Sequence, residues 1–214
     1  MKYKLVIFDL DGTILDTLED LSISLNHALS VNGFPERTYD EARRFVGNGI
    51  RKLIERAVPE NTSAEDTDKV YNDFHRHYSE HSADHTRPYD GINDLLERLK
   101  KNGIITAVVS NKADYAVQDL CKKYFNGLFD YTAGEKSGVR RKPYPDAVIA
   151  VLEKFGVSGD QAVYIGDSEV DILTAANACI DAVIVDWGFR DREMLEENGA
   201  SLIVSTIGEL ENSL

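Results

Sequence analysis

Short apolar runs recur along this sequence, and helical patterns lie between them. Five runs predict strands buried on both faces, over residues 5–8, 104–109, 162–165, 182–185 and 202–204. Amphipathic segments predict helices over residues 92–101, 114–123, 146–155, 170–178 and 192–198. Strand and helix in alternation predict an α/β fold with a doubly wound, mainly parallel sheet and a Rossmann-like core. Active sites of such sheets lie at the carboxyl ends of the strands.

One long region breaks this alternation. Residues 18–80 show helical patterns throughout, beginning with an apolar stripe at Leu18, Leu21, Leu25 and Leu29. We therefore expect a core formed by residues 1–15 and 88–214, with residues 16–87 inserted as a helical module directly after the first strand.

Composition narrows the range of partners. The chain has 214 residues, 43% of them hydrophobic and 29% charged, which is typical of a soluble globular protein. A net charge of −13 argues against nucleic acid and anionic membranes, although a locally positive site can still bind a small anion. No apolar run has the length of a signal peptide or a membrane span. Since Cys121 and Cys179 lie far apart, we expect free thiols and a cytoplasmic location.

Acidic residues follow the first predicted strand. Asp9 and Asp11 are two apart on an extended segment, so their carboxylates project to the same side. Their mutual repulsion calls for a cation, a shared proton or a substrate. Gly12 permits a sharp turn whose N–H groups can hold an anion. In isolation, this segment is also compatible with a surface turn.

Two further segments suit a phosphate group. Ser110 follows the strand over 104–109, where its hydroxyl and the N–H of Asn111 can donate to phosphoryl oxygens. Lys142 precedes a predicted helix and supplies a compact positive charge. Taken singly, the first segment is equally typical of a helix cap and the second of a solvated basic turn.

A fourth segment completes the set. Asp167 and Asp171 are four apart across a strand-to-helix turn, so both can face one point. Carboxylate oxygens from several strand ends are the ligands that Mg²⁺ requires. An acidic first helical turn, favoured by the helix dipole, explains only part of this pattern.

Together these segments resemble the four motifs of the haloacid dehalogenase-like phosphatases, over essentially the whole chain. The matching residues are Asp9-x-Asp11-x-Thr13, Ser110, Lys142-Pro143 and Gly166-Asp167-x-x-x-Asp171. Other segments are similar to the phosphoglycolate phosphatase branch, namely Phe45–Gly49, Arg87–Tyr89, Ser110–Lys112 and Trp187–Arg190. Asp90 departs from that branch, which often has proline at this position.

The resemblance implies a role for each residue. Asp9 would attack phosphorus and form an aspartyl-phosphate, while Asp11 would act as general acid and then as general base. Mg²⁺ would be bound by Asp9, the Asp11 carbonyl and Asp167, with Asp171 acting through water or orienting the site. Ser110 and Lys142 would hold the phosphoryl oxygens. In this interpretation Lys142 is the sole strong cation near the four carboxylates.

The inserted module would then be a cap that contacts a small phosphorylated metabolite, best matched by 2-phosphoglycolate. Candidate specificity residues are Arg43, Gly47, Asn48 and Arg51, although a plain helix–helix turn also explains them. His77, His81 and His85 have metal-compatible spacing, but a solvated helix face explains them better.

Several alternatives stay open. A phosphosugar mutase, a pyrophosphatase or a nucleotidase would use the same two aspartates, and a phospho-aspartate signalling module is the non-enzymatic alternative. Asp11 argues against a dehalogenase, which needs no acid at this position. The sequence does not distinguish a monomer from a dimer.

Overall fold

The computed structural model describes residues 2–214, which form two compact units. One contains the chain up to Leu15 together with Pro88–Leu214, and the other contains Asp16–Arg87. The chain crosses between them at β2 (Leu15–Asp16) and β3 (Arg87–Pro88), which pair as a two-stranded ribbon.

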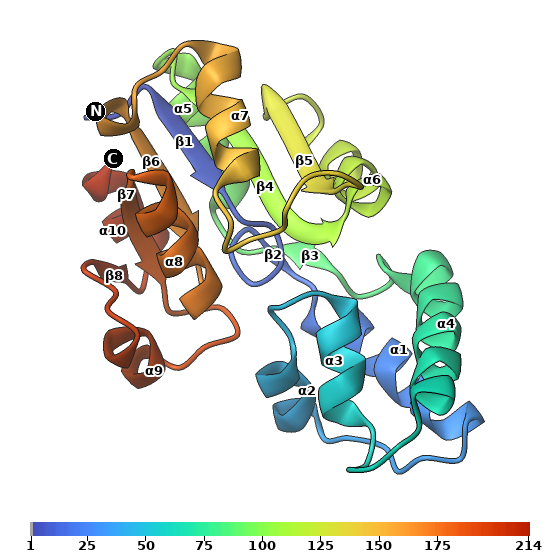
Figure 1. The fold of residues 1–214 in the computed structure, drawn as a ribbon. Coiled ribbons are helices and arrows are strands. Elements are labelled where there is room, and N and C mark those ends of the chain that lie inside the picture. Colours follow the sequence, from blue (N-terminus) through green and yellow to red (C-terminus); the bar gives the residue numbers. More distant parts are fainter. Residues whose placement is uncertain (1) are drawn as a thin grey trace. The chain divides into compact units, whose positions relative to one another are not determined.

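A six-stranded sheet organises the first unit (Figure 1). Its strand order is β5-β4-β1-β6-β7-β8, and every pairing in it is parallel. The strands are β1 (Leu5–Phe8), β4 (Ile105–Ala113), β5 (Tyr131–Glu135), β6 (Ala162–Gly166), β7 (Asp181–Val185) and β8 (Ile203–Val204). The predicted Rossmann-like α/β fold is thereby confirmed. The carboxyl ends of β1, β4 and β6 meet at one edge of the sheet.

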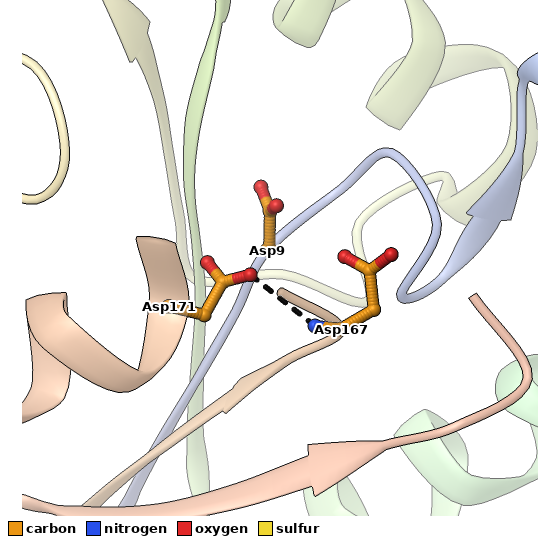
Figure 2. A group of neighbouring side chains, drawn as sticks. All are labelled: Asp9, Asp167 and Asp171. Carbon is orange, nitrogen blue, oxygen red and sulfur yellow. Dashed lines mark hydrogen bonds between the residues drawn. The ribbon is translucent and has the colours of Figure 1, made fainter. Parts of the chain in front are cut away.

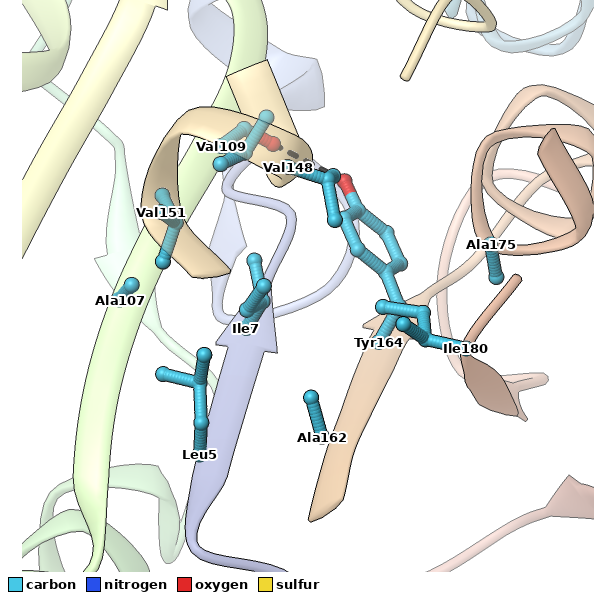
Figure 3. Close-up of a cluster of buried hydrophobic side chains, with 10 residues drawn as sticks. All are labelled: Leu5, Ile7, Ala107, Val109, Val148, Val151, Ala162, Tyr164, Ala175 and Ile180. Carbon is cyan, nitrogen blue, oxygen red and sulfur yellow. Dashed lines mark hydrogen bonds between the residues drawn. The ribbon is translucent and has the colours of Figure 1, made fainter. Parts of the chain in front are cut away.

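Helices cover both faces of this sheet. They are α5 (Ile92–Lys101), α6 (Asp114–Phe125), α7 (Asp146–Phe155), α8 (Glu169–Ala178), α9 (Arg192–Glu197) and α10 (Ile207–Ser213), with a 3₁₀ turn at Gly159–Gln161. In Figure 1, α7 and α8 lie on one face and α5 lies on the other. Alternate residues of β1, β4 and β6 pack against α7 and α8 in a buried apolar cluster (Figure 3). Burial on both faces explains why these strands read as continuous apolar runs.

Three features of this unit differ from the sequence prediction. β5 was not predicted, because this edge strand is only half-buried and carries Thr132 and Gly134 among its five residues. The short helix α10 was also missed. In addition, β4 continues past Val109 to Ala113, so that Ser110–Lys112 belong to the strand instead of a loop after it.

The second unit is helical, as the patterns over residues 18–80 predict. It contains α1 (Leu18–Val31), α2 (Tyr39–Phe45), α3 (Ile50–Ala57) and α4 (Ala64–His81), with α1 packed against α4 and α2. Leu25 and Leu29 of α1 are fully buried, as are Val70 and Phe74 of α4. The buried carboxylate of Asp20 accepts hydrogen bonds from the N–H groups of residues 85 and 86, which fixes the return of the chain.

Candidate active site

Asp9 lies directly after β1 and is almost completely buried. Its N–H donates to the Ile165 carbonyl oxygen (2.8 Å), which extends the pairing of β1 with β6. Its Oδ1 accepts a hydrogen bond from the Leu10 N–H (2.7 Å) and forms an ion pair with Lys142 Nζ (2.9 Å). No hydrogen bond from residues 2–214 reaches its Oδ2. The two oxygens of this carboxylate are therefore held differently.

Three buried carboxylates converge at this point. Figure 2 shows Asp9, Asp167 and Asp171 together, and each offers an oxygen within 4.8 Å of the others. Burial raises the pKa of Asp9 to about 7, although Lys142 acts against this shift. Burial and the charges of Asp171 and Asp9 raise the pKa of Asp167 well above its ordinary value. Ionised carboxylates packed this closely require positive charge beside them.

The segment after β7 holds Asp167 in place. The Phe189 N–H donates to Asp167 Oδ2 (2.7 Å), and Thr13 Oγ1 donates to its Oδ1 (3.4 Å). Trp187 Nε1 in turn donates to the Thr13 carbonyl oxygen (3.1 Å). The segment Trp187–Arg190 was identified in the sequence only by resemblance. In the structure it positions Asp167, directly through Phe189 and indirectly through Trp187 and Thr13.

Gly12 forms the sharp turn that the sequence predicts, and it also has a steric role. Its φ is +82°, and a Cβ at this position would clash with the carboxylate of Asp167. Its own N–H donates to the Leu15 carbonyl oxygen (2.9 Å) and closes the turn. The expectation that this turn holds a phosphate group stays a prediction.

Asp171 is engaged at both oxygens. Its Oδ2 accepts hydrogen bonds from Ser168 Oγ (2.6 Å) and from the N–H groups of Ser168 (3.1 Å) and Asp167 (3.2 Å). Its Oδ1 accepts from Lys142 Nζ (2.8 Å). This arrangement suits a carboxylate that orients its neighbours more than one that directly binds a metal ion.

Lys142 is fixed at its backbone and at its ammonium group. The side chain of Asn111 accepts from the Lys142 N–H (2.8 Å) and donates to its carbonyl oxygen (3.1 Å). The side chain of Asn111 therefore positions the lysine, while the prediction that its backbone N–H donates to a phosphoryl oxygen stays a prediction. Burial acts to lower the pKa of Lys142, but the charges of Asp171 and Asp9 outweigh it and hold the pKa well above its usual value.

A second buried lysine was missed by the sequence analysis. Lys112 Nζ donates to Asp11 Oδ1 (3.0 Å) and Oδ2 (3.3 Å), and its side chain is only 3% exposed. The prediction that Lys142 is the sole strong cation here is therefore wrong. The signal was present, since Lys112 follows Ser110 by two residues and points to the same side of an extended strand.

The charges at this edge fit a divalent cation. When all four carboxyl groups are ionised, Asp9, Asp11, Asp167 and Asp171 bring four negative charges, and Lys112 and Lys142 bring two positive ones. The remaining two negative charges equal the charge of one ion that prefers hard oxygen ligands, such as Mg²⁺. Ser110 lies within β4, two residues before Lys112, and its buried Oγ accepts from the Lys112 N–H (3.3 Å).

The predicted specificity residues lie in the second unit. Arg51 is already engaged, because it pairs with Asp68 and with Glu55 (3.2 Å). Asn48 accepts a hydrogen bond from Arg56 Nη2 (2.6 Å), a residue that the sequence did not single out. Arg43 lies in α2, and Gly47 in the turn between α2 and α3 has a φ of +119°.

The predicted histidine positions do not form a metal site. His77 Nδ1 contacts Ser24 Oγ (2.9 Å), whereas His81 pairs with Asp84 and His85 with Glu19. Within the described part of the chain, the aspartate cluster is the only group of metal-type ligands that converges. Cys121 and Cys179 form no disulfide, and among residues 2–214 no helix has both the length and the apolar character of a membrane span.

Comparison with known proteins decides the family. The haloacid dehalogenase-like hydrolase model matches residues 6–185, which include all the carboxylates and lysines described above. The chain belongs to the haloacid dehalogenase-like hydrolases. A phosphoglycolate phosphatase of Agrobacterium fabrum is 38% identical to this hydrolase over 90% of this chain and 84% of its own. One from Mesorhizobium japonicum is 36% identical over 95% and 91% of the two chains.

A solved structure supports the same branch. A Lactobacillus delbrueckii subsp. bulgaricus protein, provisionally assigned as a phosphoglycolate phosphatase, superposes on this hydrolase with a TM-score of 0.95. The two are 39% identical, and the match covers 100% of this chain and 98% of the other. The hydrolase is thus a phosphoric monoester hydrolase of the phosphoglycolate phosphatase-like branch.

Proposed function

We propose that this hydrolase cleaves a small phosphomonoester through a covalent phosphate on Asp9. The observation that carries the proposal is the arrangement of the Asp9 carboxylate. The Leu10 N–H donates to its Oδ1, Lys142 forms an ion pair with the same oxygen, and no donor from residues 2–214 binds its Oδ2. A nucleophile held this way needs little reorganisation before it attacks.

The reaction would proceed in two displacements. Asp9 Oδ2 attacks phosphorus, the bond from phosphorus to the alcohol oxygen breaks, and Asp11 gives its proton to that oxygen. Asp11 then takes a proton from water, whose oxygen attacks phosphorus and releases phosphate and Asp9. For this, Asp11 must exchange its contact with Lys112 for the reacting oxygens. Ser110 and Lys142 offset the charge on the phosphoryl oxygens.

Asp9, Asp167 and the backbone carbonyl of Asp11 would hold Mg²⁺, with Asp171 orienting the site. When bound, this ion supplies positive charge beside the phosphoryl group. The fit rests on the burial of the three carboxylates and on the two negative charges that the lysines leave unbalanced.

Metal removal should therefore silence the enzyme. We expect EDTA to abolish turnover of an aryl phosphate and Mg²⁺ to restore it. Ca²⁺ should not restore turnover, because it takes more ligands at longer distances and would misplace the reacting groups. Initial rates after chelation and re-addition of each ion test this prediction, and full activity with Ca²⁺ alone would contradict it.

The substrate that the relatives support best is 2-phosphoglycolate, the compound in the names of the phosphatases similar to this chain. Comparing kcat/KM across a panel of phosphomonoesters tests this choice. The panel should include 2-phosphoglycolate, sugar phosphates, nucleotides and pyrophosphate, and conversion of one sugar phosphate into its isomer would indicate a mutase. A clear preference for the phosphate ester of an uncharged alcohol over 2-phosphoglycolate would overturn the substrate assignment.

We assign residues 16–87 the role of a cap that reads the alcohol part of the substrate. Arg43→Ala should lower kcat/KM for 2-phosphoglycolate by about 10-fold or more, the scale of one hydrogen bond to a charged group, and spare an aryl phosphate. Arg51→Ala tests the second candidate arginine, which pairs with Asp68 and Glu55 in the same unit. If both variants lose activity equally on both substrates, or neither loses any, these arginines do not set specificity.

A further inference from the structure

The ammonium group of Lys142 lies within 3.0 Å of three oxygen atoms of the protein. It donates hydrogen bonds to Asp171 Oδ1 (2.8 Å) and to the phenol oxygen of Tyr164 (3.0 Å), and it forms an ion pair with Asp9 Oδ1 (2.9 Å). Since an ammonium group has only three N–H donors, the hydrogen bond to Tyr164 limits the directions in which the other two can point.

Tyr164 is held by apolar packing around its ring and by a hydrogen bond from its hydroxyl. It stands in β6, two residues before Gly166, and its side chain is fully buried. Figure 3 shows its ring within the apolar cluster that includes Val148 and Ile180, and shows its hydroxyl donating to the Val109 carbonyl oxygen (2.9 Å). The hydroxyl proton is thereby committed to Val109, so the phenol oxygen can only accept from Lys142.

This contact joins two strands that are not neighbours in the sheet. β1 lies between β4 and β6, yet the Tyr164 hydroxyl reaches the Val109 carbonyl, directly before Ser110. Ile7 is the β1 partner of Tyr164, and Asp9 follows Ile7 by two residues on the same face. The hydroxyl is therefore placed where Lys142 and the ends of three strands come together.

A buried tyrosine is often only a packing residue whose hydroxyl has found a hydrogen-bond partner. Here, however, phenylalanine would fill the same apolar cluster without the cost of burying a hydroxyl. Both partners of that hydroxyl belong to the site or adjoin it. Burial also raises the pKa of the phenol well above its usual value, so the group stays neutral and leaves the charge of Lys142 to the carboxylates.

We propose that Tyr164 is a positioning residue, whose hydroxyl aims the Lys142 ammonium group at Asp9 and Asp171. The proposal rests on the proposed function, because its effect is transmitted through the nucleophile. Without the hydroxyl, Lys142 retains its charge but loses one of the contacts that define its orientation. The chemical steps should therefore suffer more than the binding of substrate.

The test compares Tyr164→Phe with two controls. Tyr3→Phe makes the same chemical change in front of β1, where the Tyr3 hydroxyl donates to Asp181 (2.6 Å), away from the carboxylates. Val151→Ala removes packing from the same apolar cluster but touches no polar group of the site. Steady-state rates on an aryl phosphate with Mg²⁺ are measured below the unfolding temperature of every variant.

Tyr164→Phe should lower kcat by about 10-fold or more, on the scale of a lost hydrogen bond to a charged group, with KM within about twofold of the parent. Both controls should keep kcat near that of the parent. With an active parent, two results would overturn the inference: a kcat for Tyr164→Phe equal to that of Val151→Ala, or a raised KM with kcat unchanged. A parent without phosphatase activity would instead refute the proposed function, and the inference with it.

Discussion

Replacing Asp9 with asparagine is expected to abolish turnover while the fold remains intact. An amide is a poor nucleophile, and the side chain keeps its size at a position that is almost completely buried. The amide oxygen can still accept hydrogen bonds from Leu10 and Lys142. We expect kcat to fall by about 10⁴-fold or more, the scale reported for loss of a catalytic nucleophile.

This result is measured as steady-state kcat on 2-phosphoglycolate and on an aryl phosphate, with circular dichroism to establish the fold. Asp146→Asn is a suitable control, because Asp146 is a surface carboxylate at the start of α7 that pairs with Arg140 (2.9 Å). It should keep the activity of the parent. Activity of Asp9→Asn within tenfold of the parent would exclude Asp9 as the nucleophile.

Asp167→Asn is expected to inactivate the enzyme and also to stabilise its metal-free form. In the metal-free protein, Asp167 lies buried beside Asp9 and Asp171, and like charges at this distance oppose folding. Because burial raises the pKa of Asp167 well above its ordinary value, the carboxyl opposes folding at neutral pH whether it ionises or takes up a proton. Asparagine removes this cost, while its oxygen can still accept from the Phe189 N–H and its amide can donate to Thr13 Oγ1. Activity should fall by about 100-fold or more, as a metal ligand is lost.

Thermal unfolding with and without Mg²⁺ tests the second half of this prediction. The parent should gain stability on adding Mg²⁺, because a ligand that binds only the folded state stabilises it. Asp167→Asn should unfold at a higher temperature than the metal-free parent, by roughly 2–4 °C for each 1 kcal/mol, and should gain little from Mg²⁺. If metal-free Asp167→Asn unfolds at a lower temperature than the metal-free parent, the Asp167 carboxyl does not destabilise the fold.

Much of the fold follows from the sequence, for a clear physical reason. Strands buried on both faces must be apolar throughout, so β1, β6 and β7 stand out as continuous runs. β5 escapes this rule, because an edge strand satisfies only one side of its backbone and tolerates Thr132 and Gly134.

The candidate site was predictable in its residue types but less so in its contacts. Asp9, Asp167 and Asp171 follow strand ends that a parallel sheet brings to one edge, so their convergence is expected. The partners of Gly12, Lys112 and Tyr164 depend on side-chain directions at distances of 3 Å or so, which spacing along the chain does not reveal. Tyr164 in particular reads as an ordinary apolar strand residue.

The covalent phosphate on Asp9 is the central step of the proposed reaction, and its position on the chain can be determined directly. Asp11→Asn should slow hydrolysis of the intermediate, and mixing this variant with substrate and Mg²⁺ should accumulate phosphate on the protein. Borohydride reduces an aspartyl-phosphate to homoserine, and tandem mass spectrometry of the peptide that contains residue 9 then identifies the modified position. We predict homoserine at position 9, absent without substrate. Homoserine at another aspartate, or none anywhere while the parent and the variant both turn over, would contradict the mechanism.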